Sequence, residues 1–394
     1  MRYYIQRHSH RIIRAIVVFS VILGLALGVK YFIANRGEIG GVDEHNSATT
    51  LSDTSPASVI SRVLAVGNVS WGDHLHDVSE SSPLKAAYPF SGLNTFSRNE
   101  YDAWIASLSC GLSTNSTADG SCSDSYLGEA KKWFDVFALS STQTSGGSSI
   151  TQTKASLKNS DLQFVGNKDL ATLSDLCDVI VLPARYKLGD GSFKIASLPL
   201  AMCSFDITNG APDIRQLDEV SKFAKFLPTW VYVTTGETTA VAQNELQKSV
   251  FKGFIDNGAD MVLGVNPSIV QGAESYKGKL ILYSLGNFMY AGSASDAEQH
   301  QSVSLKAQIS TATDANMLSW VQLSSQCKGA NDDCLNLAKS KGLARPTYAY
   351  SLSIVPADNF KDSITMTSSG IWEEQALKRL DWETVLPTLK NTVQ

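Results

Sequence analysis

The chain has 394 residues, of which 43% are hydrophobic and 18% are charged, and this balance is typical of a globular protein. A disordered or fibrous protein is therefore excluded. The net charge is -5, but residues 1–34 carry five Lys or Arg and no acid, which leaves 28 basic against 38 acidic residues in the remainder. A net charge of -10 argues against nucleic acid or anionic lipid as an electrostatic partner.

An apolar run extends over Ala15–Val29, and with the five residues that follow it is about 30 Å long as a helix, enough to cross a bilayer once. Four arginines precede the run, so the positive-inside rule places the N-terminus in the cytoplasm. We predict a cytoplasmic tail over 1–14 and a transmembrane helix over 15–34 of a single-pass cell-membrane protein, with the main domain extracytoplasmic. A cleaved signal peptide is the alternative, because Ala26 and Gly28 are small residues of the kind that precede a cut.

Residues 35–59 are rich in Gly, Ser, Thr, Asp and Glu, and this composition predicts a flexible linker. In the remaining 60–394, short apolar runs alternate with amphipathic stretches, which predicts an α/β layered domain. The predicted strands are Arg62–Val66, Asp135–Leu139, Asp178–Leu182, Val231–Val233, Met261–Val265, Leu280–Leu285 and Tyr348–Val355. The predicted helices lie around Leu217–Ala224, Leu246–Phe254 and Trp372–Leu380. Asp190-Gly191 predicts a hairpin turn between Lys187 and Lys194.

All six cysteines lie in the outer part, and their even number suits an oxidising compartment. Fifteen disulfide pairings are possible. The simplest joins sequence neighbours: Cys110 with Cys122, Cys177 with Cys203, and Cys327 with Cys334. Six buried free thiols are the alternative. The first pair brackets Ser113–Ser125, which its polar composition predicts to be a surface loop, and the third lies in a segment near 311–345 that we interpret as an insertion.

One stretch has a much more specific pattern. It reads Gly258-Ala259-Asp260, then Pro267, Gln271-Gly272, Glu274, Tyr276 and Gly278-Lys279, and finally Tyr283-Ser284-Leu285-Gly286-Asn287-Phe288. This pattern resembles the signature of the CapA family of capsule or poly-γ-glutamate synthesis proteins. Phe134–Leu139 and Val165-Gly166 resemble upstream strands of the family, so the resemblance covers roughly Arg62–Tyr290. It implies a four-layer α/β/β/α sandwich of the metallo-dependent phosphatase type.

Metallophosphatase chemistry requires two divalent metals, held at strand ends by Asp, Glu, Asn and His. The chain departs from the family pattern at five expected ligand motifs. The family's Gly-Asp reads Gly67-Asn68, its Asn-Leu-Glu reads Ser107-Leu108-Ser109, its Asn-Asn-His reads Ser141-Thr142-Gln143, its His-Trp-Gly reads Thr234-Thr235-Gly236, and its His-rich motif reads Gly264-Val265-Asn266-Pro267-Ser268. The resemblance therefore implies a pseudoenzyme, with no metal, no cofactor and no catalytic residue.

The substituted positions predict a neutral polar pocket instead. Its residues are Asn68, Ser107, Ser109, Ser141, Thr142, Gln143, Thr234, Asn266 and Ser268, with Glu274 and Asn287 of the signature close by. Hydroxyl and amide groups both donate and accept hydrogen bonds, which suits a sugar, a polyol or an amide-bearing polymer. The alternative is that these residues are solvated loop tips that bind nothing.

The segment Asp73–Asp77 contains His74 and His76, which would share one face of an extended chain and could hold a metal. A solvated surface pair is the simpler interpretation. Three functions follow from these observations. The first is non-catalytic binding in the synthesis of a surface polymer, with that polymer or capsule-synthesis proteins as partners. The second is a metal-dependent hydrolase or transferase with a shifted site, and the third is a membrane-tethered protein-interaction module.

Overall fold

The computed structural model describes residues 58–114, 121–142, 149–167, 173–188, 191–236, 239–290, 297–328 and 331–392. The predicted membrane helix over 15–34 lies outside these ranges. Among the described residues, no helix is both long and apolar enough to cross a bilayer. Asp53–Gln394 forms a compact unit of its own, and everything below concerns that unit.

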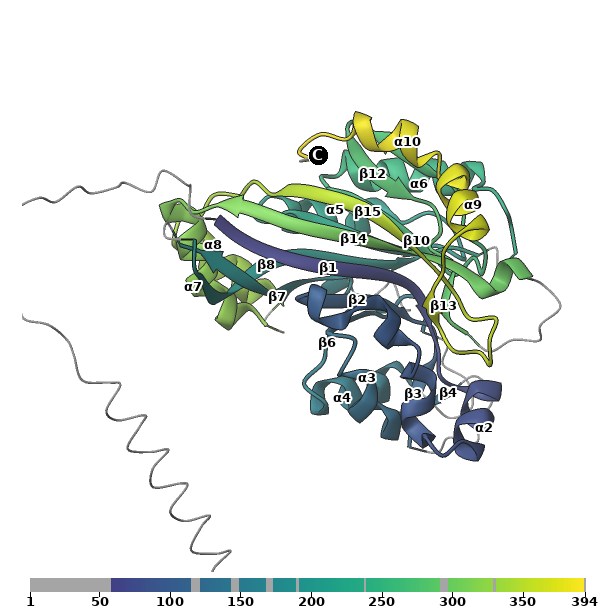
Figure 1. Cartoon of the computed structure of the whole chain (residues 1–394). Coiled ribbons are helices and arrows are strands. Elements are labelled where there is room, and N and C mark those ends of the chain that lie inside the picture. The colour runs from purple at the N-terminus through teal and green to yellow at the C-terminus, as the bar shows by residue number, and fades with distance from the viewer. Residues whose placement is uncertain are drawn as a thin grey trace, which may run out of the picture. The chain divides into compact units, whose positions relative to one another are not determined.

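The centre of the fold is the long strand β1 (Ser58–Val69), which begins inside the predicted linker. The first half of β1 pairs antiparallel with β14 (Gln301–Ala312) and, at its start, with β7 (Cys177–Lys187). The second half pairs parallel with β2 (Ala103–Leu108) and, at its end, with β13 (Asn287–Met289). Within the described ranges, β1 thus joins fourteen strands into one large mixed sheet with two arms (Figure 1).

The two arms have different neighbours. One arm continues from β7 through β8 (Phe193–Asp206), β9 (Thr229–Thr234), β10 (Met261–Val265), β12 (Lys279–Leu282) and β11 (Ala273–Tyr276). The other contains β2, β5 (Val136–Ala138) and β6 (Gln163–Val165) on one side of β1, and β14, β15 (Ala349–Asp358) and β16 (Met366–Thr367) on the other. A short separate pair is formed by β3 (Gly111–Ser113) and β4 (Ser121–Ser123).

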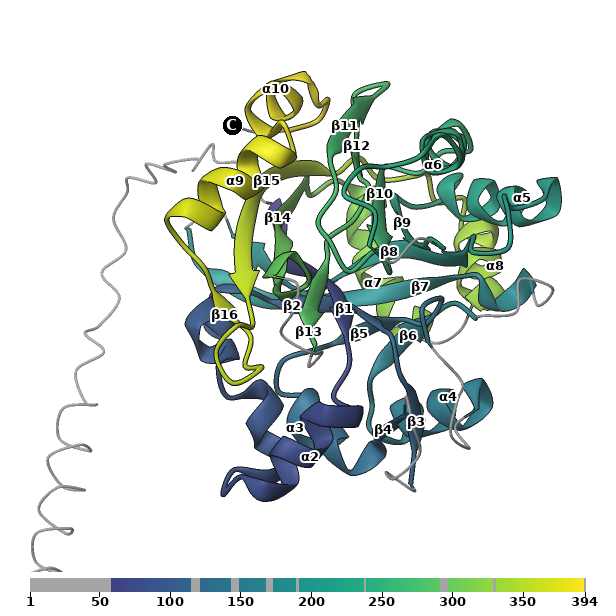
Figure 2. The same cartoon turned by 90° about the vertical axis from the view of Figure 1, so that its right-hand side faces the viewer.

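Helices cover the outer faces of this sheet (Figure 2). They are α2 (Asp73–Ser81), α3 (Leu127–Ala130), α4 (Ile150–Asn159), α5 (Ile214–Ala224), α6 (Glu245–Asp256), α7 (Ala315–Cys327), α8 (Asn331–Ser340), α9 (Ile371–Arg379) and α10 (Trp382–Val385). Helices α5 and α6 each begin with a capping box, in which an Asp213–Gln216 or an Asn244–Gln247 pair bonds the free backbone N–H groups of the first turn.

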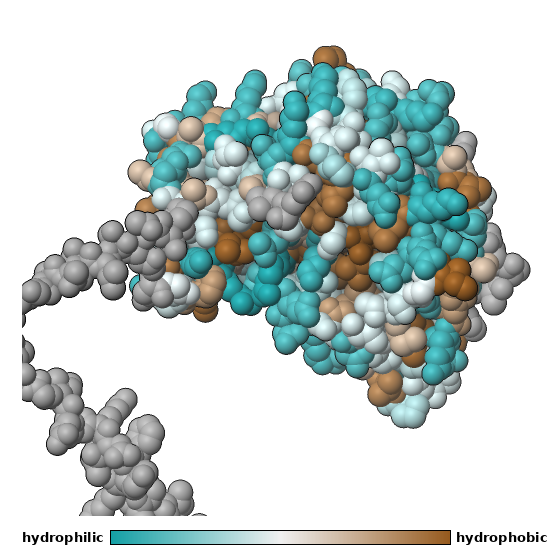
Figure 3. All heavy atoms as spheres, turned by 45° about the horizontal axis from the view of Figure 1, so that its top comes forward, coloured by the Kyte–Doolittle hydropathy of each residue, from teal (hydrophilic) through white to brown (hydrophobic). Residues whose placement is uncertain are grey.

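From Val63 onward β1 is buried on both faces, as are β2 and β5, which is why apolar residues follow one another along these stretches. Ala65 and Ile105 belong to a core shared by the two arms, whereas their neighbours Leu64 and Trp104 belong to a second core. The Tyr232 side chain on β9 extends through the shared core, and its hydroxyl donates a hydrogen bond to the carbonyl oxygen of Ile105 at 3.3 Å. The surface, by contrast, mixes polar side chains with separate apolar patches (Figure 3).

The α/β prediction is confirmed, but two local predictions are wrong. Asp73–Asp77 is not an extended loop but lies in α2. Ser113–Ser125 is not wholly at the surface, since β4 is buried around Cys122. The segment near 311–345 contributes α7 and α8, which pack against β7 and β8 and bury Trp320 in the shared core. The disulfides join sequence neighbours: Cys110 with Cys122, Cys177 with Cys203, and Cys327 with Cys334.

Buried phenols make the fold sensitive to alkali. Burial is the main cause that raises the pKa of Tyr101 to about 12 and that of Tyr126 to about 12, and it also raises the pKa of the enclosed Tyr232. Below an unfolded-state pKa near 10, both folded and unfolded chains keep these protons, and stability is unaffected. Above it, the unfolded chain releases protons that the folded chain retains, so we expect the melting temperature to fall as the pH rises from about 10 to about 12. Calorimetry alongside phenolate absorbance checks this, and phenolate formation at about pH 10 without any loss of melting temperature would contradict it.

Candidate functional site

Polar side chains gather where parallel strands end. The register places Asn68 beside Ser107 of β2 and beside Asn287 of β13. In the other arm, Thr234 at the end of β9 lies beside Asp206 at the end of β8. The carboxyl ends of parallel strands are the usual position of ligand sites in open α/β sheets. We call these residues and their hydrogen-bonded neighbours the strand-end cluster.

Three asparagines form one part of the cluster. The Nδ2 group of Asn68 donates to Oδ1 of Asn287 at 3.1 Å, and Oδ1 of Asn68 accepts the backbone N–H of Asn266 at 3.1 Å. Asn266 has a φ of +85°, a left-handed conformation that asparagine tolerates better than most residues, and its Nδ2 donates to the carbonyl of Thr235. Asn68 and Asn287 are 5% and 7% exposed, so the amides that join the ends of β1 and β10 to the start of β13 are largely shielded from water.

Hydroxyl groups form the second part. The Oγ atoms of Ser107 and Ser141 lie 2.5 Å apart, and Oγ of Ser141 also lies 3.1 Å from the carbonyl of Leu108. The Thr142 hydroxyl donates to the same carbonyl at 2.9 Å. Ser109 turns its hydroxyl to the Val69 carbonyl at 3.1 Å. These residues link the ends of β1 and β2 with the segment after β5.

Three further polar residues were missed by the sequence reasoning. The Ser140 Oγ lies 2.8 Å from Thr234 Oγ1, and Ser204 on β8 donates to Ser140 Oγ at 2.8 Å. Asp206 is 7% exposed and accepts the backbone N–H of Thr208 at 2.8 Å. The signal that could have found Asp206 is its position directly after the apolar run that forms β8.

Other predicted site residues have different positions. Gln143 lies outside the described residues. Ser268 is buried, and its carbonyl accepts the Asn287 N–H at 3.3 Å, so it belongs to the cluster. Glu274 lies on β11 at the end of its arm, where its carboxylate accepts from the Tyr283 hydroxyl at 2.7 Å and pairs with Lys252 at 2.8 Å.

The donor set of the cluster does not fit a pair of divalent metal ions. Its amides and hydroxyls are neutral, and both polar atoms of the Asn68 amide are already used within the protein. Its one carboxylate, Asp206, is engaged by a backbone N–H. Catalytic transition metals need several carboxylates or imidazoles. Among the side chains that the structure describes, no group of three or more His, Cys, Asp or Glu could hold a metal.

Within the described side chains, His76 does not belong to a group that could hold a metal. His76 projects from α2, and its Nδ1 lies 3.2 Å from the Tyr126 hydroxyl, which also donates to Glu80 at 3.1 Å. The His74 side chain lies outside the described set. Because α2 is a helix, residues 74 and 76 do not share a face as they would in an extended chain.

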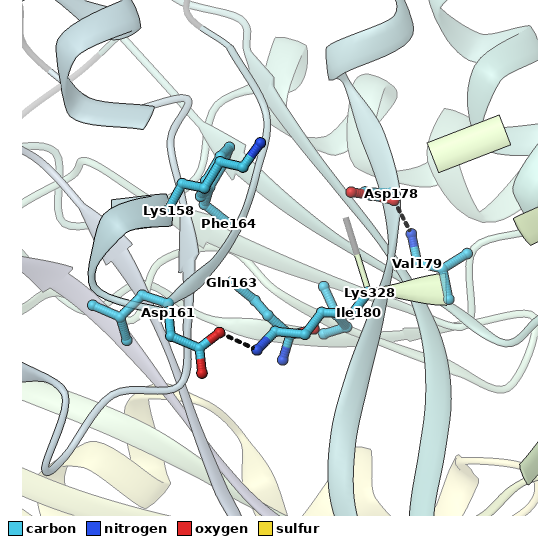
Figure 4. A pocket seen from close by; sticks show the side chains of 9 residues that line it. Lys158, Asp161, Gln163, Phe164, Asp178, Val179, Ile180 and Lys328 are labelled. Atoms are coloured by element: carbon cyan, nitrogen blue, oxygen red, sulfur yellow. Dashed lines mark hydrogen bonds and ion pairs between the residues drawn. The ribbon is translucent and has the colours of Figure 1, made fainter. Parts of the chain in front are cut away.

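A cavity of about 550 Å³ lies elsewhere, between β6 and the outer edge of β7 (Figure 4). The backbone of β7 is already satisfied there. The Gln163 amide bonds the Val181 N–H and carbonyl at 2.8 and 2.9 Å, and the Val179 N–H bonds Asp178 at 2.6 Å. Side chains that bond the backbone groups of an edge strand prevent it from pairing with another chain. This cavity therefore gives no reason to expect a bound strand.

The comparisons with known proteins concern the segment that carries part of this cluster. Residues 187–291 match the family described as bacterial capsule synthesis protein PGA_cap. The capsule biosynthesis protein CapA of Bacillus anthracis is 41% identical over 83 residues, which is 20% of each chain. The PGA biosynthesis protein CapA of Bacillus subtilis is 38% identical over 47 residues, which is 12% of each chain. The alignments thus span at most about a fifth of these relatives.

Proposed function

From the match of residues 187–291 to the capsule synthesis family, we propose that this chain is a CapA-type protein that takes part in making a capsule-like surface polymer by binding the polymer without cleaving it. The names of its relatives refer to capsule and PGA biosynthesis. The proposal includes the finer points of architecture and placement: a four-layer sandwich of the metallophosphatase type, an N-terminal anchor over 15–34, and an extracytoplasmic domain.

The observation that carries the proposal is the chemistry of the strand-end cluster. At the positions where the family pattern has metal ligands, Asn68, Ser107 and Thr234 are bonded to neighbouring polar groups. The hydroxyl of Thr235, beside them, is buried and has no hydrogen-bond partner among the residues that the structure describes. A cluster made mainly of amides and hydroxyls matches a ligand rich in the same groups, whereas it cannot activate water for hydrolysis as paired metal ions do.

Thr234→Val tests the cluster as a binding site. We expect it to weaken binding of γ-linked glutamate oligomers or a capsule polysaccharide about tenfold, since one hydrogen bond is worth about 1 kcal/mol and a polar partner also loses its bond. Titration calorimetry on the purified full chain gives the dissociation constants.

The matched control is Thr229→Val, at the other end of the same strand. Thr229 is equally buried, and its hydroxyl donates to the Leu227 carbonyl at 3.0 Å, away from the cluster. Equal weakening by both variants, or no polymer binding by the folded wild-type chain, would overturn binding at the cluster. The non-catalytic assignment has its own test, because elemental analysis that finds two tightly held transition-metal ions per chain would refute it.

A further inference from the structure

The hairpin formed by β7 and β8 carries two large apolar side chains in solvent. Ile195 is 97% exposed and Phe193 is 55% exposed. In the register of the hairpin, Phe193 lies opposite Lys187 and Ile195 lies opposite Arg185. Residues directly opposite in an antiparallel pair, and residues two apart on a strand, share a face. Arg185, Lys187, Phe193 and Ile195 therefore form one amphipathic surface, which we call the hairpin face.

The charge of the hairpin face is opposite to that of the rest of the outer chain. Neither Lys187 nor the adjacent Lys194 pairs with a carboxylate among the described residues. Arg185 lies 3.2 Å from Asp102 but keeps 49% of its side chain exposed. Between Arg185 and Ile195 the sequence has one acid, Asp190, which lies outside the described ranges. Because salt screens charges beyond roughly 10 Å, this local excess of cations acts on a nearby surface despite the acidic remainder.

The position of the hairpin face indicates which surface it meets. Ser58, the first residue of β1, pairs with Lys187, and Ile60 pairs with Arg185. Residues 1–57, which contain the apolar run Ala15–Val29, therefore join the domain beside the hairpin face. In Figure 1, the start of β1 lies at the end of the molecule where α7 and α8 pack.

We propose that the hairpin face docks on the surface of an anionic lipid bilayer. Phe193 and Ile195 enter the boundary between head groups and acyl chains, while Arg185 and Lys187 meet the lipid phosphates. This inference rests on the membrane attachment in the proposed function and adds an orientation to it. Asn68 follows Ser58 by ten residues of strand, which is about 33 Å along β1, so the strand-end cluster lies at the other end of β1 from the hairpin face.

The test uses the compact unit, residues 53–394, because without the anchor only the surface of the domain can bind. Co-sedimentation with phosphatidylcholine vesicles, with and without phosphatidylglycerol, is expected to show binding that requires the anionic lipid and weakens with added salt. Phe193→Ser with Ile195→Ser should weaken the partition constant at least about tenfold. Lys187→Ser alone should weaken it about fivefold, the contribution expected of one cation at such a surface.

A matched control is Ile214→Ser with Ile371→Ser, because these side chains are 69% and 75% exposed but lie outside the hairpin. We expect this pair to leave vesicle binding unchanged. The proposal is overturned if the wild-type unit ignores anionic vesicles, if both pairs of variants weaken binding equally, or if a cross-linker at position 195 captures a protein in membranes but no lipid. The proposed anchor over residues 15–34 is tested separately. If alkaline carbonate releases the full chain from membranes, the anchor is wrong, whatever the vesicle test shows.

Discussion

Gly264→Ala is expected to lower the free energy of unfolding by about 3 kcal/mol. Gly264 lies on β10, where a Cβ atom would sit 1.9 Å from the carbonyl oxygen of Tyr283 and 2.6 Å from its carbonyl carbon. Both of these are backbone atoms, and the Phe251 ring lies 3.0 Å away on the same site, so no side chain can move aside to make room. The strand would have to shift, which would also displace Asn266 in the strand-end cluster.

Gly253→Ala is the matched control for this change. Gly253 lies inside α6, and no heavy atom is within 4 Å of the Cβ that alanine would add. Because alanine favours helix over glycine, we expect Gly253→Ala to raise the free energy of unfolding by about 0.5–1 kcal/mol. Urea unfolding followed by circular dichroism measures both variants, and a Gly264→Ala chain as stable as wild type would show that the close approach of the two backbones is not rigid.

Asp260→Ala is expected to cost about 3 kcal/mol, because it removes a buried acceptor from three donors at once. Asp260 is 6% exposed at its side chain, and its Oδ2 accepts the Thr229 N–H at 2.8 Å. Its Oδ1 lies 2.5 Å from Lys279 Nζ. The Arg345 guanidinium pairs with the other carboxylate oxygen, Oδ2. The side chains of Lys279 and Arg345 are 26% and 36% exposed, so water takes over part of their solvation and limits the loss.

Two other variants separate the contributions at this position. Asp260→Asn keeps an acceptor for the Thr229 N–H but loses the charge, so we expect it to cost about half as much. Asp256→Ala breaks a pair with Lys277 whose side chains are 42% and 61% exposed, and should cost less than about 1 kcal/mol. Denaturant titration at low and high salt measures all three variants. An Asp260→Ala loss no larger than that of Asp256→Ala would contradict a structural role for this carboxylate.

The positions of Gly264 and Asp260 also give a structural reason for the pattern of this segment. Gly264 allows close backbone contact, and Asp260 ties β9, β12 and the segment that leads to β15 together. Neither residue has to touch a ligand to be needed. The recognisable pattern of this segment therefore indicates the fold more directly than it indicates a reaction.

The interpretation of the Asp73–Asp77 segment failed for a local reason. The alternating His74, Leu75, His76 pattern suggests an extended chain with period two. In the structure, Leu75 and Ser79 are the buried positions, four residues apart, and the Ser79 hydroxyl donates to the Leu75 carbonyl at 2.6 Å. A serine on the buried face of a short helix hides the apolar period that would have indicated α2.

The amino-acid sequence by itself determined the alternation of strands and helices, because apolar periodicity acts over a few residues. It also indicated which strand ends are polar. Only the tertiary structure decided how those ends combine, since Asn68 and Asn287 are 219 positions apart and meet through the parallel pairing of β1 with β13. Ser140, Ser204 and Asp206 joined the cluster in the same way. The physical reason is that strand order in a mixed sheet follows from packing over the whole domain, which no short stretch of sequence contains.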